Sequence, residues 1–212
     1  MFRRLLMGVR VLGLWAVVAL GAAPVSAAAP EVMSPVAAAE YLHAVLIDNM
    51  KKGRELGFDG RRAKLEPVVK EVFDMPAMAR ISTGAAWQKM SEAERAEIIA
   101  AFTAWTVANY AGNFSAWDGE TFVTKNQTPD DGKGNVLVNT QLSAKGIPPV
   151  LFNYRLHKVE AAWRIFDIYL DGAVSQLAMR RAEFAAVLAR GTAADLIAHM
   201  RKLTADARKG GG

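Results

Sequence analysis

The amino-acid sequence predicts an α+β domain in which helices wrap a curved, four-stranded antiparallel meander. Apolar residues recur at helical spacing from Ser34 to about Tyr110, alternate with a period of two over about residues 120–170, and then return to helical spacing. Short turns separate the alternating segments, so consecutive segments should pair as antiparallel strands. N- and C-terminal helices packed on one apolar sheet face would enclose a filled core or an apolar cavity, and the pattern is compatible with both.

The first 27 residues have the features of a Sec-type signal peptide. Three arginines within the first ten residues precede an apolar stretch from Val11 to Ala23, and Val25-Ser26-Ala27 offers the small-x-small pattern of a cleavage site. The apolar stretch is shorter than the roughly 20 residues of a membrane span. We therefore expect cleavage near Ala27 and a periplasmic location.

Charge and cysteine content restrict the function of the remaining chain. The chain has 26 basic and 21 acidic residues. The predicted signal peptide holds three of the basic residues, so the remaining chain has 23 basic and 21 acidic residues. This near-balance, without a basic stripe, argues against a nucleic-acid partner. The absence of cysteine excludes disulfides and thiol nucleophiles. Residues 28–208 are expected to form one domain, followed by a disordered tail at residues 209–212.

The first two helical segments are marked by residues that favour helix ends. Ser34-Pro35 is typical of an N-cap and a first helical residue, and this helix should continue to about Leu56, where Gly57 ends it. A second helical segment contains Leu65 and the apolar residues that follow it.

Two further helices precede the sheet. Asp74 and Pro76 predict the start of a short helix that ends at Gly84. Ser91 and Glu94 have the spacing of a capping box, which opens a long helix that carries Phe102, Trp105 and Tyr110.

Four segments are predicted to be strands: residues 120–125, 135–145, 149–159 and 163–170. In the third strand Val150, Phe152, Tyr154 and Leu156 should share an apolar face. In the fourth strand strict alternation places Ile165 on the face opposite Phe166, Ile168 and Leu170, so both faces of that strand are apolar.

Two helices complete the domain. The fourth strand closes at Asp171-Gly172 and leads with almost no linker into a helix that starts at Ala173 and ends at Gly191. Thr192 and Asp195 are expected to cap the last helix.

The sequence contains few candidates for catalysis. The three histidines are far apart and none has the spacing of a metal ligand, and no glycine-rich phosphate loop is present. The best candidate is Asp167 beside Tyr154, which could serve as a general base and a polarising hydroxyl in a small isomerase of cone-shaped fold. The alternative for Asp167, which we favour, is that its carboxylate accepts hydrogen bonds and fixes a helix.

Two blocks of the sequence carry a family resemblance. The first runs from Phe73 to Trp87 and is followed by the capped helix; the second runs from Trp163 to Gly172, with Phe184 beyond it. Together they resemble the MlaC/toluene-tolerance family of periplasmic lipid-binding proteins. The stretch from Ser175 to Phe184 looks most like the hopanoid-associated HpnM branch. Ala178-Met179-Arg180 departs from the Asn-Tyr-Arg typical of the phospholipid carriers.

The resemblance implies a nuclear-transport-factor-like or cystatin-like fold with a deep pocket for acyl chains. It also implies a phospholipid or hopanoid ligand, transient membrane contact, an inner-membrane transporter with an MCE-type protein and an outer-membrane lipoprotein complex as partners, no cofactor and no catalysis. A non-catalytic adaptor of a transport complex, with a filled core, is a further alternative.

Aligning the family pattern with the helix and strand spacing predicts the pocket wall. These residues are Met78, Ile81, Phe102, Trp105, Val138, Val150, Phe152, Tyr154, Ile165, Leu177 and Phe184. A place in a filled core is the alternative for each of them. Arg80 and Arg180 are expected at the pocket rim or in a structural role, with simple solvation at the surface as the alternative.

Overall fold

The computed structural model describes residues 33–210, so the predicted signal peptide lies outside the described residues. The helices that precede the sheet are α1 (Pro35–Lys51), α2 (Gly53–Val72), α3 (Met75–Thr83), the 3-10 helix η1 (Gly84–Lys89) and α4 (Glu92–Asn113). The strands are β1 (Thr121–Pro129), β2 (Val136–Ala144), β3 (Ile147–Val159), β4 (Ala162–Leu170) and β5 (Val174–Ser175). The chain continues with α5 (Gln176–Leu188) and α6 (Ala193–Gly210).

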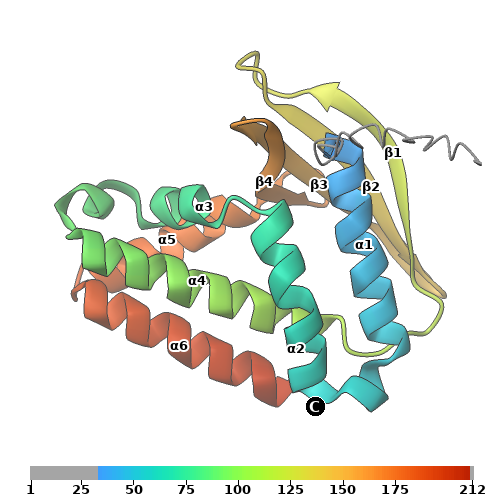
Figure 1. The fold of residues 1–212 in the computed structure, drawn as a ribbon, viewed down its shortest axis with the longest axis horizontal. Helices are drawn as coiled ribbons and strands as arrows, with labels where there is room; N and C mark the ends of the chain where they lie inside the picture. The colour runs from blue at the N-terminus through green and yellow to red at the C-terminus, as the bar shows by residue number, and fades with distance from the viewer. Residues whose placement is uncertain (1–32, 211–212) are drawn as a thin grey trace, which may run out of the picture. The chain divides into compact units, whose positions relative to one another are not determined.

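The strands form one antiparallel sheet in the order β1-β2-β3-β4-β5, which confirms the predicted α+β meander. The sequence pattern does not predict β5, a two-residue strand that pairs with the end of β4. Its turn needs a left-handed backbone at both Asp171 (φ 50°) and Gly172 (φ 77°). Figure 1 shows α1 lying against one face of the sheet and α4 running beside α6.

A β-bulge in β4 changes which of its side chains face the helices. The pairing of β3 with β4 skips one residue, Phe166, so the alternation of side chains reverses there. Ile165 and Ile168 consequently lie on the same, helix-covered face, which corrects the prediction from strict alternation. Phe166 turns to the other face, where its ring lies 4.7 Å from that of His157 and 4.8 Å from the Arg155 guanidinium.

The predicted helix caps are confirmed. Ser34, Asp74, Ser91 and Thr192 each accept a hydrogen bond from the backbone N–H three residues later. The capping box at Ser91 is complete, because the Glu94 side chain also accepts from the Ser91 backbone N–H. Helix α5 starts later than predicted, at Gln176, because β5 intervenes.

The first helix is shorter than predicted. α1 ends at Lys51 rather than near Leu56, because the chain turns there and brings Gly53 against the backbone at Ser115. A Cβ at position 53 would lie 1.7 Å from the Ser115 carbonyl oxygen. The predicted break at Gly57 does occur, as a left-handed residue (φ 57°) inside α2.

The core lies between the helix-covered face of the sheet and helices α1 to α5, and α6 packs against α4 on the outer side. Its largest fully buried side chains include Tyr154 from β3, Phe102 from α4 and Phe184 from α5. The α4–α6 contact is close, because a Cβ at Gly112 would lie 2.8 Å from the Ala207 carbonyl oxygen.

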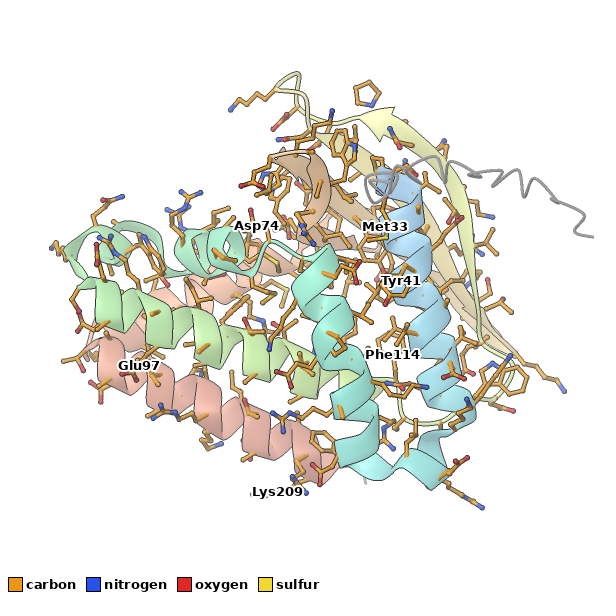
Figure 2. All side chains as sticks on the ribbon, in the orientation of Figure 1. Met33, Tyr41, Asp74, Glu97, Phe114 and Lys209 are labelled. Carbon is orange, nitrogen blue, oxygen red and sulfur yellow. The ribbon has the colours of Figure 1, made fainter. Side chains whose placement is uncertain are left out.

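Side chains also join the helices to the sheet. Asp74, labelled in Figure 2, donates its backbone N–H to Ile165 O at 2.8 Å, and its carboxylate pairs with His157 on β3 at 2.8 Å. The last helix includes Lys209 and Gly210, which the sequence assigns to the tail. Among residues 33–210 no helix is long and apolar enough to cross a bilayer.

Candidate functional site

A cavity of about 130 Å³ lies in the core between β3, β4 and helices α3, α4 and α5. Its wall is mostly apolar and consists of Phe73, Met78, Phe102, Trp105, Thr106, Asn109, Tyr110, Phe114, Phe152, Ile168, Leu170, Gln176, Leu177 and Arg180. These residues come from segments far apart in the sequence, so the cavity exists only in the folded domain.

Helix α4 supplies the longest part of the wall. Phe102, Trp105, Thr106, Asn109 and Tyr110 have the spacing of neighbours on one helix face, and all five line the cavity. The Thr106 hydroxyl donates to the Phe102 carbonyl oxygen at 2.9 Å, so this buried polar group is satisfied within the helix. Most of the cavity wall that α4 supplies therefore presents apolar surface to the cavity.

Three polar residues of the wall reach solvent, and we call them the rim: Asn109, Gln176 and Arg180. Asn109 is exposed, and Gln176 and Arg180 are half-buried. The Arg180 guanidinium lies 4.6 Å from the Trp105 ring centroid, a cation–π contact at the edge of the apolar wall. A cavity with an apolar interior and a rim of hydrogen-bond donors matches an amphiphilic ligand.

Glu183 holds Arg180 in place from the next turn of α5. Its carboxylate accepts from Arg180 Nη1 at 2.5 Å and from His199 Nε2 at 2.7 Å. Burial acts to raise the pKa of Glu183, but the hydrogen bonds from His199 and Arg180 outweigh it, so the pKa lies below its ordinary value. Glu183 therefore keeps its charge and anchors the arginine at the rim.

The structure places the predicted wall residues in three groups. Five of them line the cavity: Met78, Phe102, Trp105, Phe152 and Leu177. Four are buried in the core beyond the lining: Val138, Tyr154, Ile165 and Phe184. Two are partly buried: Ile81, which packs against the core, and Val150. Contact with a lipid remains a prediction for all of them.

The two predicted arginines have different positions. Arg180 lies at the rim, whereas Arg80 is exposed on α3 and does not line the cavity. The sequence reasoning missed Phe73, Phe114, Ile168 and Leu170 in the wall. Ile168 and Leu170 pair with Tyr154 and Phe152 on the helix-covered face, and the bulge at Phe166, which the sequence pattern does not reveal, brings Ile165 to the same face.

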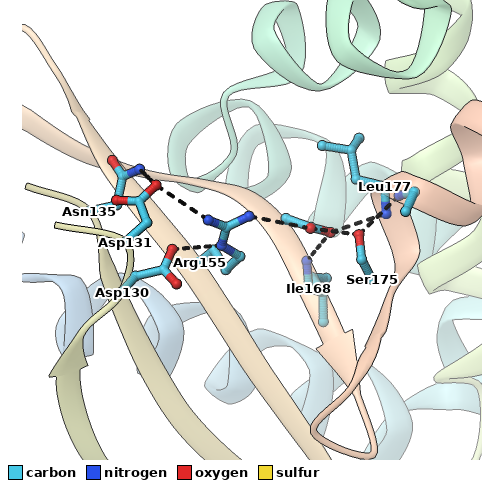
Figure 3. A network of polar contacts seen from close by, with 9 residues as sticks. Asp130, Asp131, Asn135, Arg155, Ile168, Ser175 and Leu177 are labelled. Atoms are coloured by element: carbon cyan, nitrogen blue, oxygen red, sulfur yellow. Dashed lines mark hydrogen bonds and ion pairs between the residues drawn. The ribbon is translucent and has the colours of Figure 1, made fainter. Parts of the chain in front are cut away.

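On the opposite face of the sheet Arg155 and Ser175, labelled in Figure 3, belong to a polar network that includes Asp167. The Asp167 carboxylate accepts from the backbone N–H of Ile168 at 2.8 Å and of Leu177 at 3.1 Å, and from Ser175 Oγ at 2.7 Å. Its other neighbour is Arg155, with 4.0 Å between Nη1 and Oδ2. Asp167 thus fixes the start of α5, which confirms the structural interpretation of this residue.

The catalytic arrangement of Asp167 beside Tyr154, given above as an alternative, is not formed. Tyr154 pairs with Ile168 and Asp167 pairs with Arg155 across β3 and β4, so Tyr154 and Asp167 point to opposite faces. They do not form a general base with a polarising hydroxyl. Among the described residues no group of three His, Cys, Asp or Glu side chains is placed to hold a metal ion.

A second hollow, the α1–β1 hollow, lies between those two elements and has a volume of about 510 Å³. Ala44, Ile47 and Phe122 are among its lining residues, and His43 lies at its inner side. His43 Nε2 and the Tyr154 hydroxyl share a hydrogen bond of 3.0 Å. Burial lowers the pKa of His43 to about 4 and, with a smaller effect of Tyr110, raises the pKa of Tyr154 well above its ordinary value. Both side chains are therefore neutral at neutral pH.

Comparison with known proteins identifies the family. A family model described as MlaC protein matches residues 41–202. A solved structure of a phospholipid-binding protein from Ralstonia solanacearum, in complex with a phospholipid, has a similar fold, with a TM-score of 0.68 and 19% sequence identity over 80% of this chain and 94% of that one. No curated protein sequence matches the chain at a significant level. Because the family model spans most of the chain, this protein belongs to the MlaC family.

Proposed function

We propose that this protein is a periplasmic lipid carrier that binds acyl chains in the core cavity and moves lipid between the inner and outer membranes. The observation that carries the proposal is the apolar cavity with its polar rim at Asn109, Gln176 and Arg180. Membership of the MlaC family and a similar fold in a protein solved with a phospholipid support it.

The size of the hydrophobic term explains why a carrier needs such a cavity. A phospholipid with two palmitoyl-length chains buries about 30 methylenes, each worth about 0.8 kcal/mol, so leaving a membrane costs on the order of 20 kcal/mol. Only an apolar interior can offset a cost of this size. The chains would occupy the interior beside Phe102 and Phe152, and the phosphate of the headgroup would lie at the rim near Arg180.

The cavity must enlarge to accept such a ligand. A cavity of about 150 Å³ accommodates a molecule the size of benzene, and the cavity here has about 130 Å³. Its wall includes Met78 and several aromatic side chains, which can change rotamer without losing a directional bond. The proposed carrier therefore binds lipid by moving wall side chains rather than by filling a preformed pocket.

The cellular setting of the proposal rests on family membership and on the leader. Proteins of the MlaC family are periplasmic, and residues 1–27 have the pattern of a signal peptide. The partners would be an inner-membrane transporter with an MCE-type protein and an outer-membrane lipoprotein complex, with transient membrane contact. Transfer between such partners needs no covalent step, so no catalytic residue is required.

A phospholipid is the first candidate ligand, and a hopanoid is the second. The observation in favour of a hopanoid is the stretch from Ser175 to Phe184, which resembles the hopanoid-associated branch and provides Gln176, Leu177 and Arg180 to the cavity wall.

Native mass spectrometry, followed by organic extraction, tests the proposal. The mature protein would be expressed in a host that makes both phospholipids and hopanoids. A bound lipid in a one-to-one complex is the expected result, and its identity decides between the two ligands. A folded protein that holds no lipid, and that stays empty after incubation with liposomes, would contradict the carrier and favour an adaptor with a filled core.

A further inference from the structure

Aromatic rings in contact with one another form a layer between the cavity and the α1–β1 hollow. The rings are those of Phe114, Phe122 and Phe152, and we call this layer the aromatic partition. Phe114 and Phe152 line the cavity, whereas Phe122 lines the hollow. The Phe122 ring centroid lies 5.9 Å from that of Phe152 and 6.2 Å from that of Phe114. The two spaces are thus separated by two rings in contact: Phe122 on the side of the hollow, and Phe114 or Phe152 on the side of the cavity.

The partition is held by few contacts. The Phe122 ring stacks on His43, with centroids 3.9 Å apart and an angle of 6° between the planes. His43 in turn is fixed by the hydrogen bond to Tyr154. Phe122 itself is only half-buried and belongs to β1, the edge strand of the sheet. No directional bond therefore holds the Phe122 ring, or the Phe152 ring that it meets edge-on, so both rings can change rotamer.

From this arrangement we propose that the α1–β1 hollow is a second acyl-chain branch of the lipid site, reached from the cavity when Phe122 and Phe152 swing aside. This inference rests on the proposed function. The branch would take the end of the second chain of a two-chain lipid, while the first chain stays in the cavity beside α4. A lipid with one chain would not need the branch.

The chemistry of the hollow suits a chain end. Ala44 and Ile47 of α1 and Phe122 of β1 give it an apolar surface, and the charged side chains of Glu40, Asp48 and Lys51 also line it. The long stem of Lys51 can lie against apolar surface while its ammonium group stays in water, so it can cover a chain from the solvent side. Together, the cavity and the hollow offer several times the volume of the cavity alone.

Obstruction of the hollow from its outer side tests the proposal. Ala44 is exposed and lines the hollow, so Ala44→Trp places an indole there without changing the cavity or the core. Tyr41→Trp is the matched control, because Tyr41 is exposed on the same helix and does not line the hollow. Thr124→Trp obstructs the hollow from β1 and provides a second variant. Circular dichroism would establish that each variant is folded.

The readout is the Kd of delipidated protein for dipalmitoyl phosphatidylglycerol and for its monopalmitoyl lyso form. We expect Ala44→Trp and Thr124→Trp to weaken binding of the two-chain lipid about tenfold, the effect of excluding about two methylenes, and to leave the one-chain lipid unchanged. Unchanged binding of both lipids, or equal weakening of both, would overturn the second branch and leave the carrier intact. Failure of the unmodified protein to bind either lipid would overturn the carrier itself.

Discussion

The two faces of the β3–β4 strand pair differ in the kind of contact that they make. On the helix-covered face Phe152, Ile168 and Leu170 surround a cavity through contacts that have no preferred direction. On the opposite face Arg155 and Asp167 belong to a network of directional hydrogen bonds and ion pairs, shown in Figure 3. The first kind of contact can rearrange around a ligand, whereas the second kind holds its partners in one position.

The two faces meet at the start of α5. Asp167 fixes the backbone of Leu177 from the polar face, and the Leu177 side chain lines the cavity. Arg155 also binds Asp130 at 2.6 Å, which ties the loop between β1 and β2 to the same network. A stiff frame therefore carries a deformable wall, as a carrier that must enlarge its cavity requires.

The largest effect is expected from a charge on the cavity face. Phe152→Glu places a carboxylate in the cavity wall, where the bound chains would desolvate it, and should weaken lipid binding by about 4 kcal/mol, or roughly a thousandfold. Leu151→Glu is the matched control, because Leu151 is the adjacent residue of β3 and is 40% exposed on the other face. Lipid content after extraction measures the effect. Equal lipid content in the two folded variants would remove Phe152 from the site.

On the helix-covered face, protonation of His43 at acid pH should reduce the stability of the fold. Burial lowers its pKa to about 4, below the value of about 6.5 of an unfolded chain. The unfolded state therefore binds the proton more readily, so stability is fully present above pH 6.5 and is lost as the pH falls through about 4. The shift of about 2.5 units corresponds to a loss of about 3 kcal/mol.

Urea unfolding at a series of pH values measures this loss. His43→Phe keeps a ring against Phe122 but removes the titrating group, so its stability should vary less with pH over this range. The same pH dependence in both proteins would show that other groups cause it.

On the polar face, Asp167→Asn should reduce stability without abolishing lipid binding. The substitution removes the charge beside Arg155 and puts an N–H₂ group among donors, which costs about 2 kcal/mol in the free energy of unfolding. Asp171→Asn is the control, because Asp171 is exposed and asparagine tolerates its left-handed backbone. Chemical denaturation and lipid extraction provide the two readouts. Unchanged stability would contradict the anchoring role of Asp167.

The sequence predicted those parts of the fold that depend on local signals. Ser34, Asp74 and Ser91 cap helices through bonds to residues three positions away, so the pattern alone locates those helix starts. The alternation of residues in β3 also predicted correctly that Phe152 and Tyr154 lie on the opposite face of the sheet from Arg155. This prediction held because the extra residue of the bulge is on β4, and β3 itself stays regular there. These signals lie within one turn or one strand.

The parts that the sequence did not predict depend on contacts between distant segments. The bulge at Phe166 arises from the pairing of β4 with β3, and it places Ile165 on the same face as Ile168 and Leu170. The end of α1 depends on the approach of Gly53 to Ser115. Helical spacing could have extended the α4 wall from Phe102 to Asn109, but only packing shows which face of a helix meets an empty space.

The smallest effect is expected at the rim, where the two kinds of contact come together. Arg180 is held by a directional bond to Glu183 and lies against the Trp105 ring of the cavity wall. If its guanidinium also binds the headgroup phosphate, Arg180→Gln should weaken binding of an anionic phospholipid by about 1 kcal/mol, roughly fivefold, and less at high salt. Arg181→Gln, which changes an exposed arginine on the same helix, should have no effect. Equal affinities of the two variants, measured with phosphatidylglycerol at low and high salt, would place the headgroup elsewhere and leave Arg180 a structural part of the rim.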